Sequence, residues 1–477
     1  MTLPIAVSER PDAVVVGSGP NGLAAAITLA KAGRSVVVHE AEPTAGGGTR
    51  SEALTLPGFV HDVCAAVLPL AVGSPFLRSV PLDRYGVTFI HPTIPLAHPF
   101  DDGSAAVLLR SVDETAAALG PDAVAYRRLM GPLVDEWETL IGILLGPLRP
   151  TRHVVTLARF GLSGLRSAHG LATSAFAGAR ARALFGGLAI HAIIPLERPP
   201  SAAFGLVLAL LGHTVGWPVV QGGSGQFAAA LVALLQSLGG KVIANSRVDS
   251  IDDVLPARTV LLDLTPRQIL KIAGHRLPLG YRNRLDRYRH GPGAFKVDWA
   301  LAGPVPWRAP ECHLAGTVHL GGTIEELAAS ERAVWRDEVP DRPVVLVTQP
   351  SLFDPSRAPA GQHTLWAYCH VPHGSTVDAV DRIEAQIERF APGFRDQILA
   401  RNSMSPAALE KYNANYIGGD INGGVEDFKQ LWTRPVARLN PYITPDPSLF
   451  ICSSSTPPGG GVHGMCGYWA ARAALDR

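Results

Sequence analysis

The sequence predicts an α/β fold in which a discontinuous domain built on a parallel sheet is interleaved with a second, α+β domain. Three observations support this prediction: the length of the chain, a strand–turn–helix–strand unit near its start, and short strands that resume after residue 240 and again near the C-terminus. At 477 residues the chain has roughly two to three times the usual domain size. Because it contains no repeat and no flexible linker, we expect interleaved domains.

The composition excludes several classes of protein. Hydrophobic residues make up 47% of the chain and charged residues 17%, which supplies a large core and rules out a disordered chain. The formal net charge is +1, so nothing suggests a nucleic-acid partner, which would need a concentrated basic surface. The 49 glycines and 40 prolines predict many loops and close backbone approaches.

Cysteine and histidine spacing bears on metals and on the cellular compartment. The five cysteines form no CxxC pair, and the 16 histidines show no HxH or HExxH spacing, so we expect neither a disulfide framework nor a metal site. A strand-like run begins too early to leave room for a secretory signal, and no apolar stretch reaches the roughly 20 residues that span a bilayer. We therefore expect a cytoplasmic protein whose only membrane association is peripheral.

The N-terminal unit is the clearest motif. An apolar run, Ala13–Val16, predicts a buried strand, and a glycine-rich turn at residues 17–22 then opens a helix, Leu23–Ala32. A second apolar strand, Ser35–His39, ends at Glu40. This order of elements, within about 30 residues, opens a Rossmann unit.

The turn in this unit is typical of a dinucleotide site. Its first two glycines let backbone N–H groups approach a pyrophosphate, and the third lets helix and strand pack closely. Glu40, 18 residues after Gly22, is placed to accept hydrogen bonds from an adenosine ribose. The alternative is a glycine-rich turn without a ligand. The residues expected to contact the dinucleotide are Gly17, Gly19, Pro20, Asn21, Gly22 and Glu40.

Two further glycine clusters indicate which dinucleotide binds. The cluster at 46–48 precedes Arg50 and suits a long ligand that lies across the sheet edge. The cluster at 459–464 is followed by only 13 residues, too few for another Rossmann unit. It instead sets the N–H donors and positive end of a helix against an electron-rich group such as a flavin edge, which points to FAD. The contacts expected from these clusters are Gly46, Gly47, Gly48, Arg50, Gly461, Val462 and His463.

Five motifs along the chain resemble those of a known family. They are Gly17-x-Gly19-x-x-Gly22, Glu40 with Gly46-Gly47, Trp217-Pro218-x-x-x-Gly222-Gly223-Ser224, Asn415-Tyr416-x-Gly418-Gly419-Asp420, and Leu449–Cys452 with Pro458–Gly464. They resemble phytoene-dehydrogenase-type proteins of the flavin amine oxidase superfamily, in particular the branch of pyridine nucleotide-disulphide oxidoreductase domain-containing protein 2. The chain departs from this family at Gly48, where many relatives carry Arg, and at Ser453–Ser455, where Gly-x-Gly is usual.

The resemblance implies a discontinuous Rossmann-type FAD-binding domain with an interleaved α+β substrate-binding domain, a non-covalent FAD and a hydrophobic small-molecule substrate. It also implies that main chain near Val248 contacts the adenine and that residues 263–266 lie where the chain crosses the cofactor. Val248, Thr265 and Ser454 are therefore added to the expected FAD contacts. The FAD-binding domain would comprise residues 1–75, 220–275 and 440–477, and the substrate-binding domain residues 76–219 and 276–439.

Local patterns predict the remaining elements. Apolar residues at helical spacing, as on the face formed by Ile383, Ile387 and Phe390, predict helices, and short β-branched runs predict strands. The helices are expected at 113–119, 123–145, 180–194, 226–238, 378–390 and 464–475. The strands are expected at 241–244, 247–251, 259–264, 295–301, 344–348 and 449–452.

Lys296 is a candidate for chemistry because it lies inside a predicted strand. Lys296 and Asp298 would share one face, opposite Phe295, Val297 and Trp299. In the amine oxidase superfamily a lysine on a comparable strand holds a water near flavin N5, and this segment resembles it. The alternative is a surface ion pair with Asp298 on an edge strand, which would contribute little to stability.

Three histidines and two aromatic residues complete the candidate site. His463 either donates a proton beside the flavin or contributes only its backbone N–H to the turn. His191 is either catalytic or a satisfied core residue of an apolar helix. His213, Trp217 and Tyr416 are expected to line the substrate pocket.

These features together predict a FAD-dependent oxidoreductase that transfers hydride from a hydrophobic molecule to flavin N5, with desaturation of an isoprenoid- or lipid-like substrate preferred. The alternatives are a flavin amine oxidase, a redox-neutral flavin-dependent isomerase and a non-catalytic FAD-containing scaffold. The sequence does not indicate the electron acceptor. Two apolar segments, Leu184–Ile194 and Ser201–Gly212, either form a mouth open to a bilayer or pack as core helices.

Overall fold

A parallel sheet unites segments from both ends of the chain in this computed structural model, which describes residues 10–255 and 257–477. The strand order is β16-β10-β1-β2-β9, with the first strand at the centre. Short strands of Val, Leu and Ala are typical of a parallel sheet that is covered on both faces. Its members are β1 (Ala13–Val16), β2 (Val36–His39), β9 (Lys241–Ile243), β10 (Thr259–Leu262) and β16 (Leu449–Ile451).

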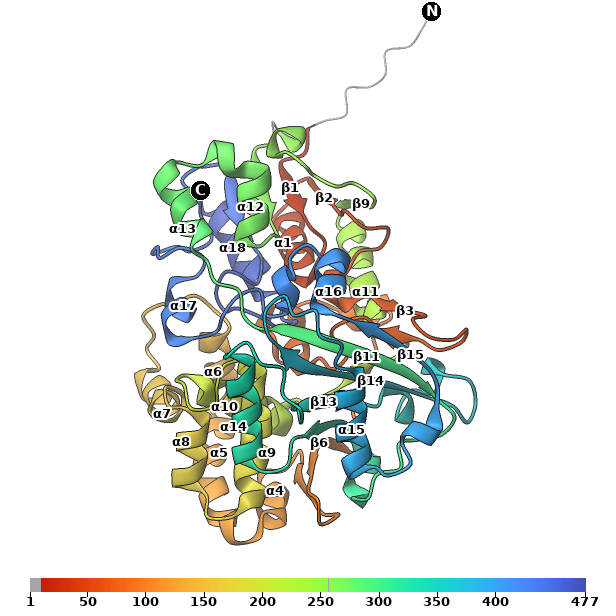
Figure 1. The fold of residues 1–477 in the computed structure, drawn as a ribbon. Coiled ribbons are helices and arrows are strands. Elements are labelled where there is room, and N and C mark those ends of the chain that lie inside the picture. Colours follow the sequence, from red (N-terminus) through yellow and green to blue (C-terminus); the bar gives the residue numbers. More distant parts are fainter. Residues whose placement is uncertain (1–9, 256) are drawn as a thin grey trace, which may run out of the picture.

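Helices cover both faces of the parallel sheet. Val15 points into the core cluster that contains α1, whereas its neighbours Val14 and Val16 point into a second cluster with Ile269 and Ile272, as the two-residue period of a strand requires. Figure 1 shows α1, α11, α12 and α18 around β1 and β2 in the upper part of the molecule. These helices are α1 (Pro20–Lys31), α11 (Ser224–Ser237), α12 (Pro266–Ala273) and α18 (Met465–Leu475), and α13 (Leu279–Asp286) lies beside α12.

A seven-stranded mixed sheet forms the centre of the second region. Its order is β15-β11-β14-β13-β12-β6-β7, and β11 is buried along its whole length. Phe295, Val297 and Trp299 pack on one face in a core that includes Ile383 and Ile387 of α15. The members are β6 (Ile94–Pro99), β7 (Ala105–Leu108), β11 (Gly293–Leu301), β12 (Ala315–Leu320), β13 (Val345–Thr348), β14 (His363–Val371) and β15 (Ile398–Met404). Two small ribbons pair β3 (Ser51–Glu52) with β4 (His61–Asp62) and β5 (Phe89–Ile90) with β8 (Val219–Val220).

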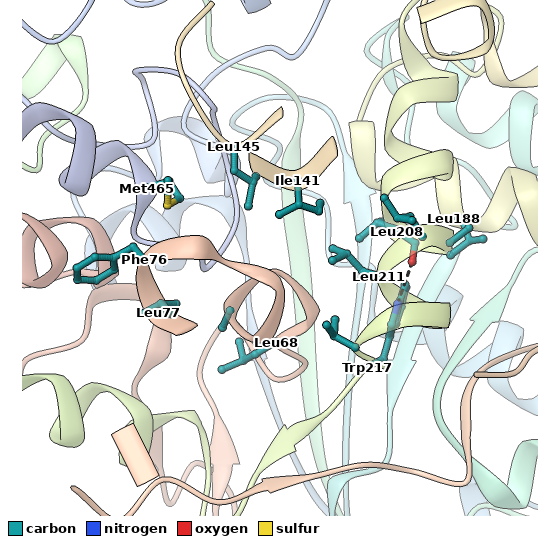
Figure 2. Packing of buried hydrophobic residues seen from close by; sticks show 14 of the residues in the cluster. Leu68, Phe76, Leu77, Ile141, Leu145, Leu188, Leu208, Leu211, Trp217 and Met465 are labelled. Atoms are coloured by element: carbon teal, nitrogen blue, oxygen red, sulfur yellow. Dashed lines mark hydrogen bonds between the residues drawn. The ribbon is translucent and has the colours of Figure 1, made fainter. Parts of the chain in front are cut away.

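A group of helices lies beside this sheet, at the lower left of Figure 1. Figure 2 shows Leu208 and Leu211 among the side chains of its apolar core, with Trp217 Nε1 donating a hydrogen bond to Leu208 O at 3.2 Å. The group comprises α4 (Val112–Ala118), α5 (Ala123–Asp135), α6 (Trp137–Leu144), α7 (Val154–Gly164), α8 (Ala168–Ala175), α9 (Ala179–Ala189), α10 (Ser201–Thr214) and α14 (Ile324–Val334). The other helices are α2 (Pro69–Gly73), α3 (Pro75–Arg78), α15 (Val380–Phe390), α16 (Pro406–Tyr412) and α17 (Phe428–Thr433).

The predicted fold class is confirmed, and most predicted elements lie within a few residues of their expected bounds. Every strand of the parallel sheet falls inside the ranges predicted for the FAD-binding domain, although the domain boundaries themselves stay a prediction. The predicted strand at 247–251 is wrong, because Ser250 caps a 3-10 turn at Ile251–Val254 instead. The predicted helix at 123–145 is interrupted at Glu136, and the mixed-sheet strands β6, β7, β12, β14 and β15 were not predicted.

The two apolar segments are core helices. Leu184–Ile194 and Ser201–Gly212 are buried over nearly all of their length, so neither forms an apolar mouth. Five of the exposed large apolar side chains lie on and beside α7, at Leu148, Val154, Val155, Leu162 and Leu165, and the others are spread along the described chain. None of the helices in the described part of the chain is both long and apolar enough to cross a membrane. Peripheral membrane contact stays a prediction.

Gly467 tests the packing of α18 on α1. A Cβ at this position would overlap the backbone of Asn21, so Gly467→Ala must push the two helices apart. We expect a loss of about 3 kcal/mol in the free energy of unfolding, measured by urea denaturation. The control is Gly142→Ala on α6, where a Cβ meets no atom within 4 Å and should add about 0.5–1 kcal/mol of helix stability. Equal stability of the two variants would contradict the close packing.

Candidate functional site

A cavity of about 420 Å³ is lined by residues of both sheets. Glu40, Val248 and the glycine turn line the end formed by the parallel sheet. Lys296 lines the end formed by the mixed sheet, together with Trp217 and His191, whose rings pack against His319 of β12. The predicted site residues that line the cavity are Gly17, Gly19, Pro20, Asn21, Glu40, Gly47, Gly48, Arg50, His191, Trp217, Val248, Lys296, Tyr416, Ser454, Gly461 and Val462. Those that lie outside its lining are Gly22, Gly46, His213, Thr265, Asp298 and His463.

The glycine turn is closed by backbone contact. Gly17 has φ +99°, which favours glycine, and a Cβ on Gly22 would overlap the Gly17 carbonyl oxygen. Gly22 N donates a hydrogen bond to Asp263 Oδ2 at 2.9 Å. Among the first residues of α1, Pro20 has no N–H group, and Gly22 and Leu23 donate theirs within the protein, so Asn21 is the residue that offers a backbone N–H group at the cavity lining.

Glu40 already accepts several hydrogen bonds from the protein. Its carboxylate accepts from Ser18 N at 3.0 Å, from Ser18 Oγ and from Glu42 N at 2.9 Å. Arg50 Nη2 lies 3.2 Å from Glu40 Oε1, while Arg50 Nε donates to Thr44 O at 2.8 Å. Arg50 therefore orients Glu40 at the wall of the cavity, and its guanidinium is engaged by the protein itself.

Asp263 follows β10, and its carboxyl group contacts the start of α1. The sequence predicts that it lies near the cofactor but assigns it no role. Burial raises its pKa to about 7, with Glu40 adding to the shift and the Gly22 N–H opposing it. A cavity-lining carboxyl group with this pKa changes its charge near neutral pH, beside the turn that would hold a pyrophosphate.

Lys296 and Asp298 form a buried ion pair, so the alternative of a surface pair on an edge strand is wrong. Strand β11 lies between β15 and β14, and the two side chains are 3% and 0% exposed. His61 Nδ1 lies 3.6 Å from Asp298 Oδ1. Burial raises the pKa of Asp298 to about 6 against the opposing effect of Lys296, and burial with nearby cations lowers the pKa of His61 to about 3. At neutral pH the pair is charged and His61 is neutral.

The ion pair belongs to a larger buried network. Arg357 Nη2 contacts Asp62 Oδ2 at 2.6 Å, and both side chains are almost fully buried. Asp62 Oδ1 also accepts from Ser51 Oγ at 2.7 Å and from Ser224 N at 2.7 Å. No local pattern in the sequence predicts these contacts, because the residues come from distant parts of the chain.

The mixed sheet presents an aromatic and polar wall to the cavity. Tyr368 lies opposite Lys296 in the β11–β14 register, and Trp366 lies opposite Asp298. The two aromatic rings are 5.2 Å apart in an edge arrangement. Thr348, Leu346 and Thr317 continue the same face across β13 and β12 and also line the cavity. Thr364, Trp366, Tyr368 and His370 alternate with apolar residues, a pattern typical of a strand. This pattern could have predicted β14 and its cavity-facing side chains.

His463 serves the C-terminal turn itself. Its Nδ1 accepts from Met465 N at 3.0 Å and its Nε2 lies 3.2 Å from Gly459 O, so both ring nitrogens are engaged. Burial lowers its pKa to about 4. The side chain therefore stabilises the turn through its ring nitrogens, which neither alternative for His463 described, and it is Gly461 and Val462 that line the cavity.

His191 and His213 differ in position. His191 lines the cavity, and its Nε2 lies 3.2 Å from His319 Nε2. Burial lowers the pKa of His191 to about 3, so it is neutral. His213 lies in the core, with Nε2 2.7 Å from Tyr126 Oη, and the structure does not bring it to the cavity. Within the described residues, no group of three or more His, Cys, Asp or Glu side chains is arranged to hold a metal ion.

Comparison with known proteins supports the resemblance that the motifs predict. Residues 15–78 match the family of NAD(P)-binding Rossmann-like domains. The chain is 26% identical to pyridine nucleotide-disulfide oxidoreductase domain-containing protein 2 of Mus musculus, over 96% of this chain and 92% of that protein. It is also 26% identical to a phytoene dehydrogenase of Streptomyces griseus, over 81% and 77% of the two chains. A solved double mutant of putrescine oxidase has the same fold, with a TM-score of 0.60, 19% identity and 98% coverage of each chain.

Replacement of Asp263 by Asn should remove a pH dependence of folding. Because the folded-state pKa lies above the usual 3.8, the parent binds an extra proton between about pH 4 and 7 and loses stability as the pH rises through that range. Asp263→Asn keeps an acceptor oxygen for Gly22 N and titrates no proton. Without added cofactor, we expect the variant to gain up to about 4 kcal/mol on the parent between pH 4 and 7, at about 1.4 kcal/mol per pKa unit.

Urea unfolding of both proteins from pH 4 to 8 makes the measurement. Asp249→Asn, which changes an exposed carboxylate nearby, is the matched control and should follow the parent at every pH. Parallel curves for the parent and Asp263→Asn would show that this carboxyl group titrates in its ordinary range.

Proposed function

We propose that the protein is a FAD-dependent oxidoreductase that binds FAD non-covalently and oxidises an uncharged, hydrophobic substrate. The observation that carries the proposal is a single cavity that joins Glu40 and the glycine turn to the C-terminal turn at Gly461–Val462 and to the wall around Lys296. Similarity to a phytoene dehydrogenase supports an oxidoreductase that acts on a hydrophobic molecule.

The residues of the cavity fit a dinucleotide. A Cβ on Gly47 would lie 3.1 Å from Gly19 Cα, and Gly47 has φ +53°, so the two glycine clusters pack closely at the cavity and a larger residue at position 47 would be strained. The N–H groups of the turn would hold the pyrophosphate, Glu40 the ribose and the main chain near Val248 the adenine. Gly461 and Val462 would contact the flavin. FAD would supply a hydride acceptor, and this chain would position the substrate bond and exclude water.

Charge distinguishes the two ends of the cavity. The carboxylates among its described lining residues are Glu40, Glu42 and Asp263, which all lie near the dinucleotide motifs. The other end has the cation Lys296 and no lining carboxylate to pair with an ammonium group. This arrangement supports desaturation of an isoprenoid- or lipid-like molecule over oxidation of a charged amine.

A flavin amine oxidase is the second candidate. The edge-to-face pair of Trp366 and Tyr368 beside Lys296 is the observation that favours it, because aromatic rings can flank an amine at a flavin. Anaerobic incubation of the purified protein with a cell lipid extract, and separately with a panel of amines, distinguishes the two. Bleaching of the flavin bands by the lipid fraction alone supports the first candidate, and bleaching by amines alone supports the second.

FAD content is the first test of the proposal. We expect the recombinant protein to be yellow and to release intact FAD on heating or acidification. Glu40→Ala should cost about 1–3 kcal/mol of FAD binding, because the ribose hydroxyls lose their acceptor and Arg50 loses its partner. Glu52→Ala, which removes an exposed carboxylate from β3, is the control and should bind FAD as the parent does. A colourless protein that cannot be reconstituted with FAD would refute the proposal.

Substitution of Lys296 is the second test of the proposal. Because Lys296 is buried, the choice of variants has to account for the charge that remains on Asp298. Lys296→Met alone leaves Asp298 buried without its cation and should cost about 3–5 kcal/mol of stability. The double variant Lys296→Met/Asp298→Asn leaves neither charge and should recover much of that loss. If Lys296 holds a water at the flavin, the flavin of the dithionite-reduced double variant should reoxidise ~10-fold more slowly than that of the parent, as measured by stopped flow. Reoxidation at the rate of the parent in a folded, FAD-loaded double variant would leave Lys296 with a structural role.

A further inference from the structure

The end of the cavity remote from Glu40 carries uncharged polar groups among apolar walls. Thr317 Oγ1 is buried and has no hydrogen-bond partner among the residues that the structure describes. Tyr368 and Thr348 line the same end, and no described residue forms a hydrogen bond with either hydroxyl group. His191, neutral at physiological pH, adds a ring whose Nε2 contacts His319.

The strand register places these groups on one face of the sheet. Thr317 lies opposite Thr348, and Tyr368 lies opposite both Leu346 and Lys296. Neighbouring strands are about 4.8 Å apart, so the hydroxyl groups of Tyr368 on β14, Thr348 on β13 and Thr317 on β12 extend over roughly 10 Å. Leu208, Trp217, Leu346 and Trp366 supply the apolar part of the same lining.

We propose that this end of the cavity binds an elongated apolar molecule that carries an uncharged hydrogen-bonding oxygen, a hydroxyl or a carbonyl group, and that Tyr368 Oη is a contact of that oxygen. This inference rests on the proposal that the substrate enters here, and it narrows the substrate class. A pure hydrocarbon would leave the hydroxyl groups without partners, which is unfavourable. An oxygenated molecule restores the hydrogen bonds, whereas a cationic one would be desolvated beside Lys296 with no lining carboxylate as a counter-ion, and Lys296 is already paired with Asp298.

Binding of four C12 probes tests the inference: dodecane, dodecan-1-ol, dodecan-2-one and dodecylamine. Each is delivered from a cyclodextrin reservoir to the holoprotein, and the Kd is measured by calorimetric competition, which needs no flavin signal. We expect the alcohol and the ketone to bind ~10-fold or more tightly than dodecane, the scale of one hydrogen bond, and tighter than protonated dodecylamine. In Tyr368→Phe, which removes only the hydroxyl, the preference over dodecane should fall to about threefold or less.

The matched control is Tyr281→Phe. Tyr281 Oη is also buried without a partner, but it lies in the core beside the parallel sheet and outside the cavity lining. This variant should keep the full preference of the parent. The inference is overturned if dodecane binds as tightly as the alcohol, if no probe binds, or if Tyr368→Phe retains the preference.

Flavin content, measured on each preparation before titration, separates this inference from the proposed function. A protein that lacks FAD but still prefers the oxygenated probes would refute the FAD proposal and retain the polar contact. A yellow protein that does not discriminate among the probes would retain FAD binding and refute the polar contact.

Discussion

Two cations and two carboxylates balance their charges in a buried region where β11 of the mixed sheet meets the β3–β4 ribbon. Lys296 pairs with Asp298 on β11, and Arg357 pairs with Asp62 on β4, and all four side chains are at most 3% exposed. Because an isolated buried charge costs several kcal/mol, removal of any one member leaves a net charge that the interior cannot solvate. The cavity borders this network through Lys296, so its wall is fixed by the charge balance.

This network also sets the polarity of the cavity. Asp298 pairs with Lys296 on the mixed sheet, while Glu40 and Asp263 lie at the ends of strands of the parallel sheet. The charged groups that suit a dinucleotide are therefore separated from the neutral wall of Tyr368, Thr348 and Thr317. A ligand that bridges both regions would place a charged, hydrogen-bonding part at the parallel sheet and an uncharged part at the mixed sheet, where it could contact a second molecule. FAD and an apolar substrate would require this arrangement.

The site residues that could be predicted from the sequence are those whose positions follow from the pattern of neighbouring residues. The alternation of Lys296 and Asp298 with Phe295 and Val297 correctly predicted two faces of one strand. The pattern could not show that β11 is central, because the neighbours of a strand are chosen by contacts between distant segments. Asp62 and Arg357 are nearly 300 positions apart, and nothing near either residue indicates the other. His213 was misplaced for the same reason, since its partner Tyr126 comes from another helix.

The position of the glycine motifs in the fold can be predicted from the sequence, because a side chain at these positions would overlap or crowd the neighbouring backbone. Gly22 touches the Gly17 carbonyl, Gly47 touches Gly19, and Gly467 of α18 touches the backbone of α1 at Asn21. The last contact fixes the distance between the two glycine turns of the predicted FAD site, since α1 begins at one turn and α18 at the other. The spacing of these turns therefore depends on helix packing rather than on loop conformation. A flavin dinucleotide needs that rigidity, because its pyrophosphate and its ring system must be held at once by groups from opposite ends of the chain.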